Sequence, residues 1–321
     1  PPDLVILDVM MPGITGYEIC RKLRDNPATA SVPIIILTAR GQPVDRQAAL
    51  DAGADEYMSK PVTMIELSEH IEALLEENHT EQTPLLSGTV VLLSLRGGVG
   101  TTTLATNLAA LLAQSGDKNV CLIDLCPSSG HAALQLGLRP EPNWTGLRRA
   151  GEINTQVLDA HLLKHDSGLH VLASPVFPVA RERALSRATT QATFNVLQQG
   201  FSTIVVDAAP VLDEATAAAV EAASVVGLVV TAEPPSIQTA VGTMRAFKNW
   251  FAKFRIILNQ VNPGPQPPVE AIQRTLKRPV AGAVPFDSSQ AQALTQGAPL
   301  ALQNPSSPLV QGVKTLIEGL T

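Results

Sequence analysis

Apolar residues recur along the first 78 residues with two different periods, which indicates alternating strands and helices. Residues 4–7 and 33–37 are continuously apolar and rich in β-branched side chains, as strands buried on both faces are. Residues 17–24 and 64–77 instead carry apolar side chains at helical spacing. The pattern predicts a parallel α/β unit over residues 1–78.

A polar stretch follows this unit, and a second α/β series follows the stretch. Residues 76–84 (EENHTEQTP) lack periodicity and end in proline, so we place a linker at 79–88. Helical patterns separate nearly all of the later strand candidates, which predicts a second doubly wound domain over residues 89–321, with a mostly parallel sheet flanked by helices. The candidate strands are 90–95, 120–125, 169–173, 203–207, 225–231, 256–261 and 280–284.

The composition is typical of a globular protein with two domains. The chain has 321 residues, of which 45% are hydrophobic. A net charge of −6 and an aromatic content of 3% disfavour nucleic acid as the main partner. Cys20, Cys121 and Cys126 lack metal-ligand spacing and predict reduced thiols in a cytosolic protein. No apolar stretch is both long and uninterrupted enough to span a bilayer, and we expect no signal peptide.

Three polar residues follow successive strand candidates of the first unit. Asp8 and Thr38 end two apolar runs, and Lys60 follows the segment 54–59. Because ligands of open parallel sheets bind at the carboxyl ends of the strands, we expect these side chains to share one site. The Asp8 carboxylate would act there as a nucleophile toward phosphorus, and the Thr38 hydroxyl and Lys60 ammonium would bind phosphoryl oxygens.

This joint spacing resembles the receiver domain of two-component response regulators, which has a flavodoxin-like fold. The resemblance implies a phosphoacceptor at Asp8, switch residues at Thr38 and Tyr57, Lys60 before a cis proline, and a histidine kinase or phosphotransfer protein as partner. It also implies that the first strands and the acidic pair that binds Mg²⁺ precede Pro1, so that this is an N-terminally truncated receiver. We expect phosphoryl transfer to be impaired in such a fragment, because the metal neutralises developing charge.

A glycine-rich loop opens the second domain. Residues 94–103 (SLRGGVGTTT) lie between the apolar run 89–93 and a helical pattern that begins at Leu104. In such a strand–loop–helix context, backbone N–H groups and a helix N-terminus bind phosphate. A P-loop ends in Gly-Lys-[Ser/Thr], whereas Thr101 stands here in the lysine position. The segment therefore predicts nucleotide binding and leaves hydrolysis open.

From Thr89 onward the chain resembles the ParA/MinD family of deviant P-loop ATPases. The family's loop, Lys-Gly-Gly-x-Gly-Lys-Thr-[Thr/Ser], sets Arg96 on the signature lysine and Thr101 on the P-loop lysine. The resemblance implies ATP and Mg²⁺ as ligands and an adenine contact at Asn259. The residues that it assigns to the nucleotide are Arg96, Gly97, Gly98, Val99, Gly100, Thr101, Thr102, Thr103, Asn259 and Pro285.

The family's metal and water positions are only partly kept. Thr102 falls on the hydroxyl that coordinates Mg²⁺, and Asp207 falls on a carboxylate that acts near the metal through water. Asp124 is the first of two aspartates that act in catalysis or position water, and Cys126 replaces the second. Thr101 lacks the charge of the P-loop lysine, and Arg96 is bulkier than the signature lysine. The Cys126 thiol cannot orient water as a carboxylate does. We therefore expect ATP binding with weak or absent hydrolysis.

Within this family the chain is most similar to pilus-assembly proteins of the CpaE/TadZ type, which often pair a receiver-like domain with this fold. Threonine at the P-loop lysine position recurs in that branch. The resemblance implies a homodimer that sandwiches the nucleotide, and pilus or secretion machinery as partners. It also implies a cytoplasmic protein that partners recruit to a pole or a membrane-associated machine.

DNA and membrane are weaker candidates as partners. Arg181, Arg183 and Arg187 lie in a helical pattern over residues 180–187, which is better explained by a solvated helix face than by DNA binding. The terminal pattern contains Lys314 as its single cation, so it lacks the basic amphipathic tail of membrane-binding relatives. We therefore expect no main role for DNA and no direct membrane insertion.

Three functions remain open on these residues. The first is a receiver coupled to an ATP-binding localisation scaffold with weak or absent hydrolysis. The second is a slow genuine ATPase in which Arg96 replaces the lost lysine. The third is a response regulator whose second half is a nucleotide-free interaction module. Thr101 and Cys126 disfavour the second function, whereas Thr102 and Asp207, with Asp124 and Asn259, disfavour the third.

Overall fold

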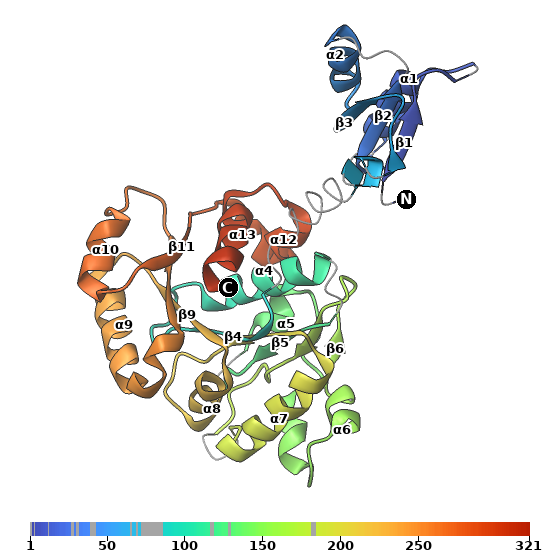
Figure 1. The fold of residues 1–321 in the computed structure, drawn as a ribbon. Helices are drawn as coiled ribbons and strands as arrows, with labels where there is room; N and C mark the ends of the chain where they lie inside the picture. Colours follow the sequence, from blue (N-terminus) through green and yellow to red (C-terminus); the bar gives the residue numbers. More distant parts are fainter. Residues whose placement is uncertain are drawn as a thin grey trace. The chain divides into compact units, whose positions relative to one another are not determined.

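The computed structural model divides the chain into two compact units, residues 1–82 and 83–321, each described here by itself (Figure 1). The structure describes residues 2, 4–11, 13–26, 29, 32–38, 43–64, 66–68, 70–71, 86–115, 119–127, 130–180 and 184–321. Among these residues no helix is both long and apolar enough to cross a bilayer.

The first unit contains a parallel three-stranded sheet in the order β1–β2–β3. The register sets Asp8 beside Leu37 and Thr38 beside Ser59, so that the carboxyl ends of the strands share one edge. The described elements are β1 (Val5–Asp8), α1 (Gly16–Asp25), β2 (Ile34–Thr38), α2 (Pro43–Asp51) and β3 (Glu56–Ser59). The predicted α/β class is confirmed, and β3 adds a strand that hydrophobic periodicity alone did not define.

Local sequence explains how α1 begins. The Thr15 side chain accepts a hydrogen bond from the Glu18 backbone, and the Glu18 carboxylate accepts one from the Thr15 backbone, which is a reciprocal capping box. Cys20 then packs in the core beneath the sheet. Of the helix predicted over 64–77, residues 64, 66–68 and 70–71 are helical, and the others lie outside the described residues.

The second unit is built on an eight-stranded sheet in the order β11-β10-β9-β4-β8-β5-β7-β6. Every neighbouring pair is parallel except β6 and β7. The predicted parallel sheet is thus confirmed. Its strands are β4 (Gly88–Leu93), β5 (Val120–Asp124), β6 (Leu163–Lys164), β7 (His170–Leu172), β8 (Thr203–Asp207), β9 (Val225–Val230), β10 (Phe254–Asn259) and β11 (Val280–Val284).

Helices cover both faces of this sheet (Figure 1). Val90 and Leu92 of β4 pack in one apolar cluster and Val91 and Leu93 in the other, because successive side chains of a strand point to opposite faces. The first cluster includes residues of α4 (Thr101–Gln114), α5 (Ala132–Gln135), α11 (Ser289–Gln296), α12 (Leu300–Gln303) and α13 (Pro308–Leu320). The second includes residues of α6 (Thr155–Asp159), α7 (Arg187–Gly200), α8 (Glu214–Ala222), α9 (Pro234–Ala246) and α10 (Val269–Leu276), with 3₁₀ turns at Trp144–Arg149 and Lys248–Lys253 nearby.

Two expectations about element boundaries are corrected. The helix expected over 180–187 is wrong for its described part: α7 begins at Arg187, and Ser186 caps it by accepting a hydrogen bond from the Thr189 backbone. Arg181 and Arg183 lie outside the described residues. Residues 86–88, expected at the end of the linker, join the second unit, because Leu86 is buried and its carbonyl accepts a hydrogen bond from the Thr203 hydroxyl.

Candidate functional site

The glycine-rich loop follows β4, which lies between β9 and β8 near the centre of the sheet, and leads into α4. Gly98 and Gly100 have φ values of 81° and 89°, which side chains rarely adopt. A Cβ on Gly100 would lie 2.3 Å from Asn259 Nδ2, whereas a Cβ on Gly97 or Gly98 would meet nothing within 4 Å. The loop is therefore packed against β10 on one side and open on the other.

The open side of the loop faces a cavity of about 320 Å³. The lining includes the predicted residues Arg96, Gly97, Gly98, Gly100, Thr101, Thr102, Thr103, Cys126 and Asp207, and also Ser94, His131, Ala208 and Pro210. No lysine belongs to this described lining. The structure thus collects segments after β4, β5 and β8 around one space, at the strand ends where parallel α/β sheets bind ligands.

Three predicted nucleotide residues lie outside the lining of this cavity. Val99 is 2% exposed and packs in the apolar core beneath the loop. Asn259 is buried at the end of β10, and its Nδ2 donates a hydrogen bond of 2.8 Å to the Val99 carbonyl. Pro285 is exposed after β11. Asn259 therefore supports the loop from below, and its adenine contact stays a prediction, as does that of Pro285.

Two buried carboxylates lie side by side at the cavity, and one of them, Asp207, lines it. Asp124 and Asp207 end β5 and β8 and are register partners, 1% and 4% exposed. Burial raises the pKa of Asp124, although the backbone N–H groups of Cys126 and Ala132 donate to its carboxylate and act to lower it. Burial and the neighbouring charge of Asp124 hold the pKa of Asp207 well above its ordinary value. The surroundings of the pair therefore disfavour the form in which both carboxylates are charged.

Thr102 connects the loop to this pair. Its side chain hydrogen-bonds to Asp207 and acts to lower the pKa of that carboxyl. A hydroxyl beside a carboxylate at the edge of a phosphate-sized space suits Mg²⁺, which is commonly bound by one or two carboxylates, water and substrate phosphates. Among the described residues no cluster of three or more His, Cys, Asp or Glu side chains forms an all-protein metal cage. The donor set thus fits a cation that arrives with a phosphate ligand.

Arg96 and His131 are the basic residues of the cavity lining. The Arg96 Nη2 lies 2.7 Å from the Glu233 Oε2, across 137 positions of sequence. His131 precedes α5, and its charge when protonated favours the ionised form of Asp124. Sequence reasoning missed both Glu233 and His131, because neither lies in a motif and only the fold brings them to the loop.

The first unit has a strand-end site of a different kind. The Lys60 ammonium donates a hydrogen bond to Asp8 Oδ2, and the Met10 backbone donates to Oδ1 at 3.1 Å. These contacts, the Lys60 hydrogen bond first, lower the pKa of Asp8. The Lys60 backbone N–H donates to the Thr38 carbonyl at 2.7 Å, so the predicted Asp8, Thr38 and Lys60 gather at the edge of one sheet. Tyr57 packs against the core of this unit. The Lys60–Pro61 bond is cis, as the resemblance implied.

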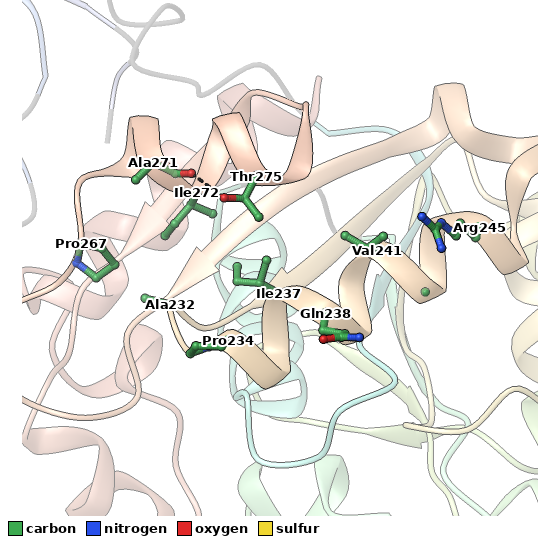
Figure 2. A pocket seen from close by; sticks show the side chains of 11 residues that line it. Ala232, Pro234, Ile237, Gln238, Val241, Arg245, Pro267, Ala271, Ile272 and Thr275 are labelled. Carbon is green, nitrogen blue, oxygen red and sulfur yellow. Dashed lines mark hydrogen bonds between the residues drawn. The ribbon is translucent and has the colours of Figure 1, made fainter.

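A larger cavity of about 750 Å³ lies between α9 and α10 (Figure 2). Ile237 and Val241 of α9 and Ile272 of α10 give it an aliphatic wall, and Arg245 stands on the C-terminal turn of α9. Its polar members are Gln238, Arg245 and Thr275. This groove therefore offers packing surface and lacks the glycine loop and carboxylates of the strand-end cavity.

The comparisons with known proteins match each of the two units to a domain family. Residues 90–300 match the family described as the CobQ/CobB/MinD/ParA nucleotide binding domain. The chain belongs to this family. Residues 1–72 match the response regulator receiver domain. The receiver and ParA/MinD resemblances are therefore confirmed at the level of the domains.

Solved structures of the family share the fold of the second unit. A ParA family ATPase from Chlorobium tepidum has a TM-score of 0.65 at 19% identity, over 72% of this chain and 97% of its own. MinD of Pyrococcus horikoshii, solved with Mg-ADP, has a TM-score of 0.61 at 20% identity, over 72% of this chain and 94% of its own. Identities this low show the fold alone.

Curated relatives match the first unit. The phosphate regulon transcriptional regulatory protein PhoB of Rhizobium meliloti is 48% identical over 80 residues, which are 25% of this chain and 35% of that protein. Response regulator PleD of Caulobacter vibrioides is 40% identical over 73 residues, 23% of this chain and 16% of that protein. The chain thus spans about a third or less of the length of these relatives.

Proposed function

We propose that this chain is a two-component-type regulator in which a phosphoacceptor receiver is coupled to an ATP-binding localisation scaffold with weak or absent hydrolysis. The cavity at the glycine loop carries the proposal. It joins an open phosphate-sized loop, the Thr102–Asp207 contact and a buried carboxylate pair, but no lysine lines it. Such a site favours holding a nucleotide over turning it over.

The loop geometry supports ATP as the ligand. Gly97 and Gly98 leave room for phosphate oxygens to approach the backbone, and the loop leads into the 14-residue helix α4, whose N-terminus favours negative charge. Thr102 and Asp207 would hold Mg²⁺. When bound, the cation supplies the positive charge that the carboxylate pair lacks and neutralises phosphate charge. Thr101 and Arg96 would contact the phosphates from the mouth of the cavity.

The departures from the family pattern support slow or absent hydrolysis. Thr101 offers the phosphates a hydrogen bond but no charge. Cys126 stands beside the cavity where the family has a second aspartate, and its own backbone N–H is bound by Asp124 at 2.9 Å. A slow ATPase is the second candidate, favoured by the place of Arg96 in the lining of the cavity.

The receiver would supply the signal. The Asp8–Lys60 contact lowers the pKa of Asp8 and so favours the ionised carboxylate, the form that a nucleophile toward phosphorus requires. A histidine kinase or phosphotransfer protein would be its partner. The scaffold would act as a homodimer on pilus or secretion machinery, and this part of the proposal rests on the resemblance to CpaE/TadZ-type proteins.

Nucleotide titration of the whole chain tests the proposal. A fluorescent ATP analogue should bind saturably in the presence of Mg²⁺. The factor by which Mg²⁺ tightens this binding should be about tenfold smaller in Thr102→Val, since one charge-assisted contact is lost. Thr315→Val is the matched control, because the Thr315 hydroxyl bonds within α13 to the Gln311 carbonyl. Absence of binding at millimolar nucleotide would leave an interaction module with a receiver as its switch.

A further inference from the structure

The guanidinium of Arg96 reaches an acidic residue that lies outside every motif of the loop. Its Nη2 contacts the Oε2 of Glu233 at 2.7 Å, and the two side chains are 34% and 45% exposed. Arg96 lines the cavity at the loop, whereas Glu233 precedes α9 and does not. The ion pair therefore ties the one arginine of the described cavity lining to another element.

Glu233 is itself held in place. Its second oxygen, Oε1, accepts a hydrogen bond of 3.2 Å from the Thr231 hydroxyl, and the Thr231 backbone N–H donates to the Ser236 hydroxyl at 2.9 Å. Thr231 is buried and directly follows β9. A carboxylate at the N-terminal end of a 13-residue helix is also electrostatically favoured. The partner of Arg96 is thus an anchored anion.

An anchored carboxylate and a phosphate chain compete for the same guanidinium. A carboxylate carries one negative charge, whereas a triphosphate carries several and matches the guanidinium fork equally well. We propose that Glu233 is a positioning residue that holds Arg96 at the edge of the cavity and releases it to the phosphates of a bound nucleoside triphosphate. This inference rests on the proposed ATP binding and assigns that site a residue that weakens binding.

The competition predicts that Glu233→Gln binds ATP more tightly. Glutamine keeps an oxygen for the Thr231 hydroxyl and removes the charge that holds Arg96. A half-exposed ion pair is worth little, so the Kd for Mg-ATP should fall about two- to five-fold. AMP has fewer phosphate charges to exchange for the carboxylate, so its Kd should change less. A merely structural role of Glu233 would not alter the ratio of the two affinities.

Glu221→Gln is the matched control. Glu221 forms an ion pair with Arg187 at similar exposure, 40% and 45%, and it lies outside the cavity lining. Its removal changes net charge equally, so it should leave the Kd for ATP unchanged. Arg96→Gln should weaken ATP binding. Adding Glu233→Gln to Arg96→Gln should not tighten ATP binding.

The experiment is equilibrium titration of the whole chain and these variants with Mg-ATP and with AMP. Tighter ATP binding by Glu233→Gln that vanishes in the Arg96→Gln background supports the inference. An unchanged or raised Kd, or a gain that persists without Arg96, overturns it and leaves ATP binding intact. If Glu233→Gln binds Mg-ATP and the native chain does not, the inference is supported, and the Arg96–Glu233 ion pair then prevents binding in the native chain. Absence of binding by both overturns the inference and the proposed function together.

Discussion

Two carboxylate sites, one in each unit, lie at the carboxyl ends of parallel strands and differ in their charge balance. Asp8 and Asp207 both end a parallel strand. Asp8 lies at the surface with the Lys60 ammonium on its carboxylate, which lowers its pKa. Asp207 is buried beside Asp124, which together with burial raises its pKa. Topology thus places the acid at the strand end, and its neighbours decide its charge.

The difference indicates different tasks for the two sites. A carboxylate that is ionised and open to solvent suits covalent capture of a phosphoryl group. A buried pair without a lysine suits a site that receives its cation together with its ligand. The two sites therefore differ most clearly in one residue: a lysine follows β3 in the first unit, whereas a threonine stands in the loop after β4 in the second.

Giving the second site its missing charges is the strongest way to break the contrast. Thr101→Lys combined with Cys126→Asp should raise the rate of phosphate release from Mg-ATP about 100-fold, because each well-placed group of this kind contributes a few kcal/mol to the transition state. Steady-state phosphate release by the whole chain measures it. Each single substitution is the control, and an unchanged rate in the double variant would show that the site is not poised for hydrolysis.

The loop geometry provides the next largest effect. Gly100→Ala should lower the free energy of unfolding by about 2–3 kcal/mol, because φ is strained for alanine and the Asn259–Val99 hydrogen bond must break. Gly97→Ala, whose Cβ meets nothing within 4 Å, should cost less than about 1 kcal/mol. Denaturant unfolding of both variants checks this. Equal stability would contradict the packing of the loop on Asn259.

Asp287 sharpens the contrast because it is buried and yet favours its charged form. Burial acts to raise its pKa, but hydrogen bonds, among them those from the backbone N–H groups of Ser289 and Leu309, outweigh burial and lower it. A lowered pKa in the folded state stabilises the fold above the unfolded-state pKa, and this stability is lost as the pH falls through the folded value. Asp287→Asn should therefore cost about 1–2 kcal/mol at neutral pH.

The pH dependence provides the check on Asp287. Between pH 7 and pH values below about 4, where carboxylates gain protons, the stability difference between the native chain and Asp287→Asn should shrink. Unfolding curves at both ends of this range measure it. A difference that stays constant would mean that the charge of Asp287 adds nothing.

The smallest effect concerns the Asp8–Lys60 contact. Lys60→Met should raise the pKa of Asp8 toward its ordinary value, because the hydrogen bond from Lys60 is the largest cause of its lowering. Titration of the Asp8 carboxyl followed by NMR measures this shift. Lys22→Met is the control, since Lys22 lies in the last turn of α1. An unchanged pKa of Asp8 in Lys60→Met would show that Lys60 does not favour the charged form of Asp8.

The sequence predicted most of the fold, because most long apolar runs form strands, and those of β4 and β9 are buried on both faces. The run of β1, expected to be buried on both faces, is only partly buried, since Ile6 is exposed. It missed β6, Leu163–Lys164, since two residues carry no periodicity. It also extended a helix over residues 180–187, where the Ser186 cap decides the start instead. Residues of the glycine loop and Asp207 line one cavity, because the carboxyl ends of the neighbouring strands β4 and β8 meet at one edge of the sheet, and their role toward a nucleotide stays a prediction.

Contacts that join distant segments could not be predicted. Glu233 reaches Arg96 from 137 positions away, and Asn259 reaches Val99 from 160 positions away. Both contacts depend on the strand order, in which β9 and β10 lie on the same side of β4. The sequence motifs do not determine this order, because it depends on how the crossover connections run. Sequence motifs indicate candidate ligand-binding residues, whereas the fold identifies the residues that hold these candidates in place.

Calorimetric titration of the whole chain with Mg-ATP tests the central claim most directly, because one trace records both the heat of binding and any sustained heat of turnover. The account predicts saturable binding with little or no sustained heat, as expected of a nucleotide site without a lysine. Saturable binding with continuous heat would establish a genuine ATPase. No binding at millimolar ATP would contradict the account, and the cavity at the loop would then not be a nucleotide site.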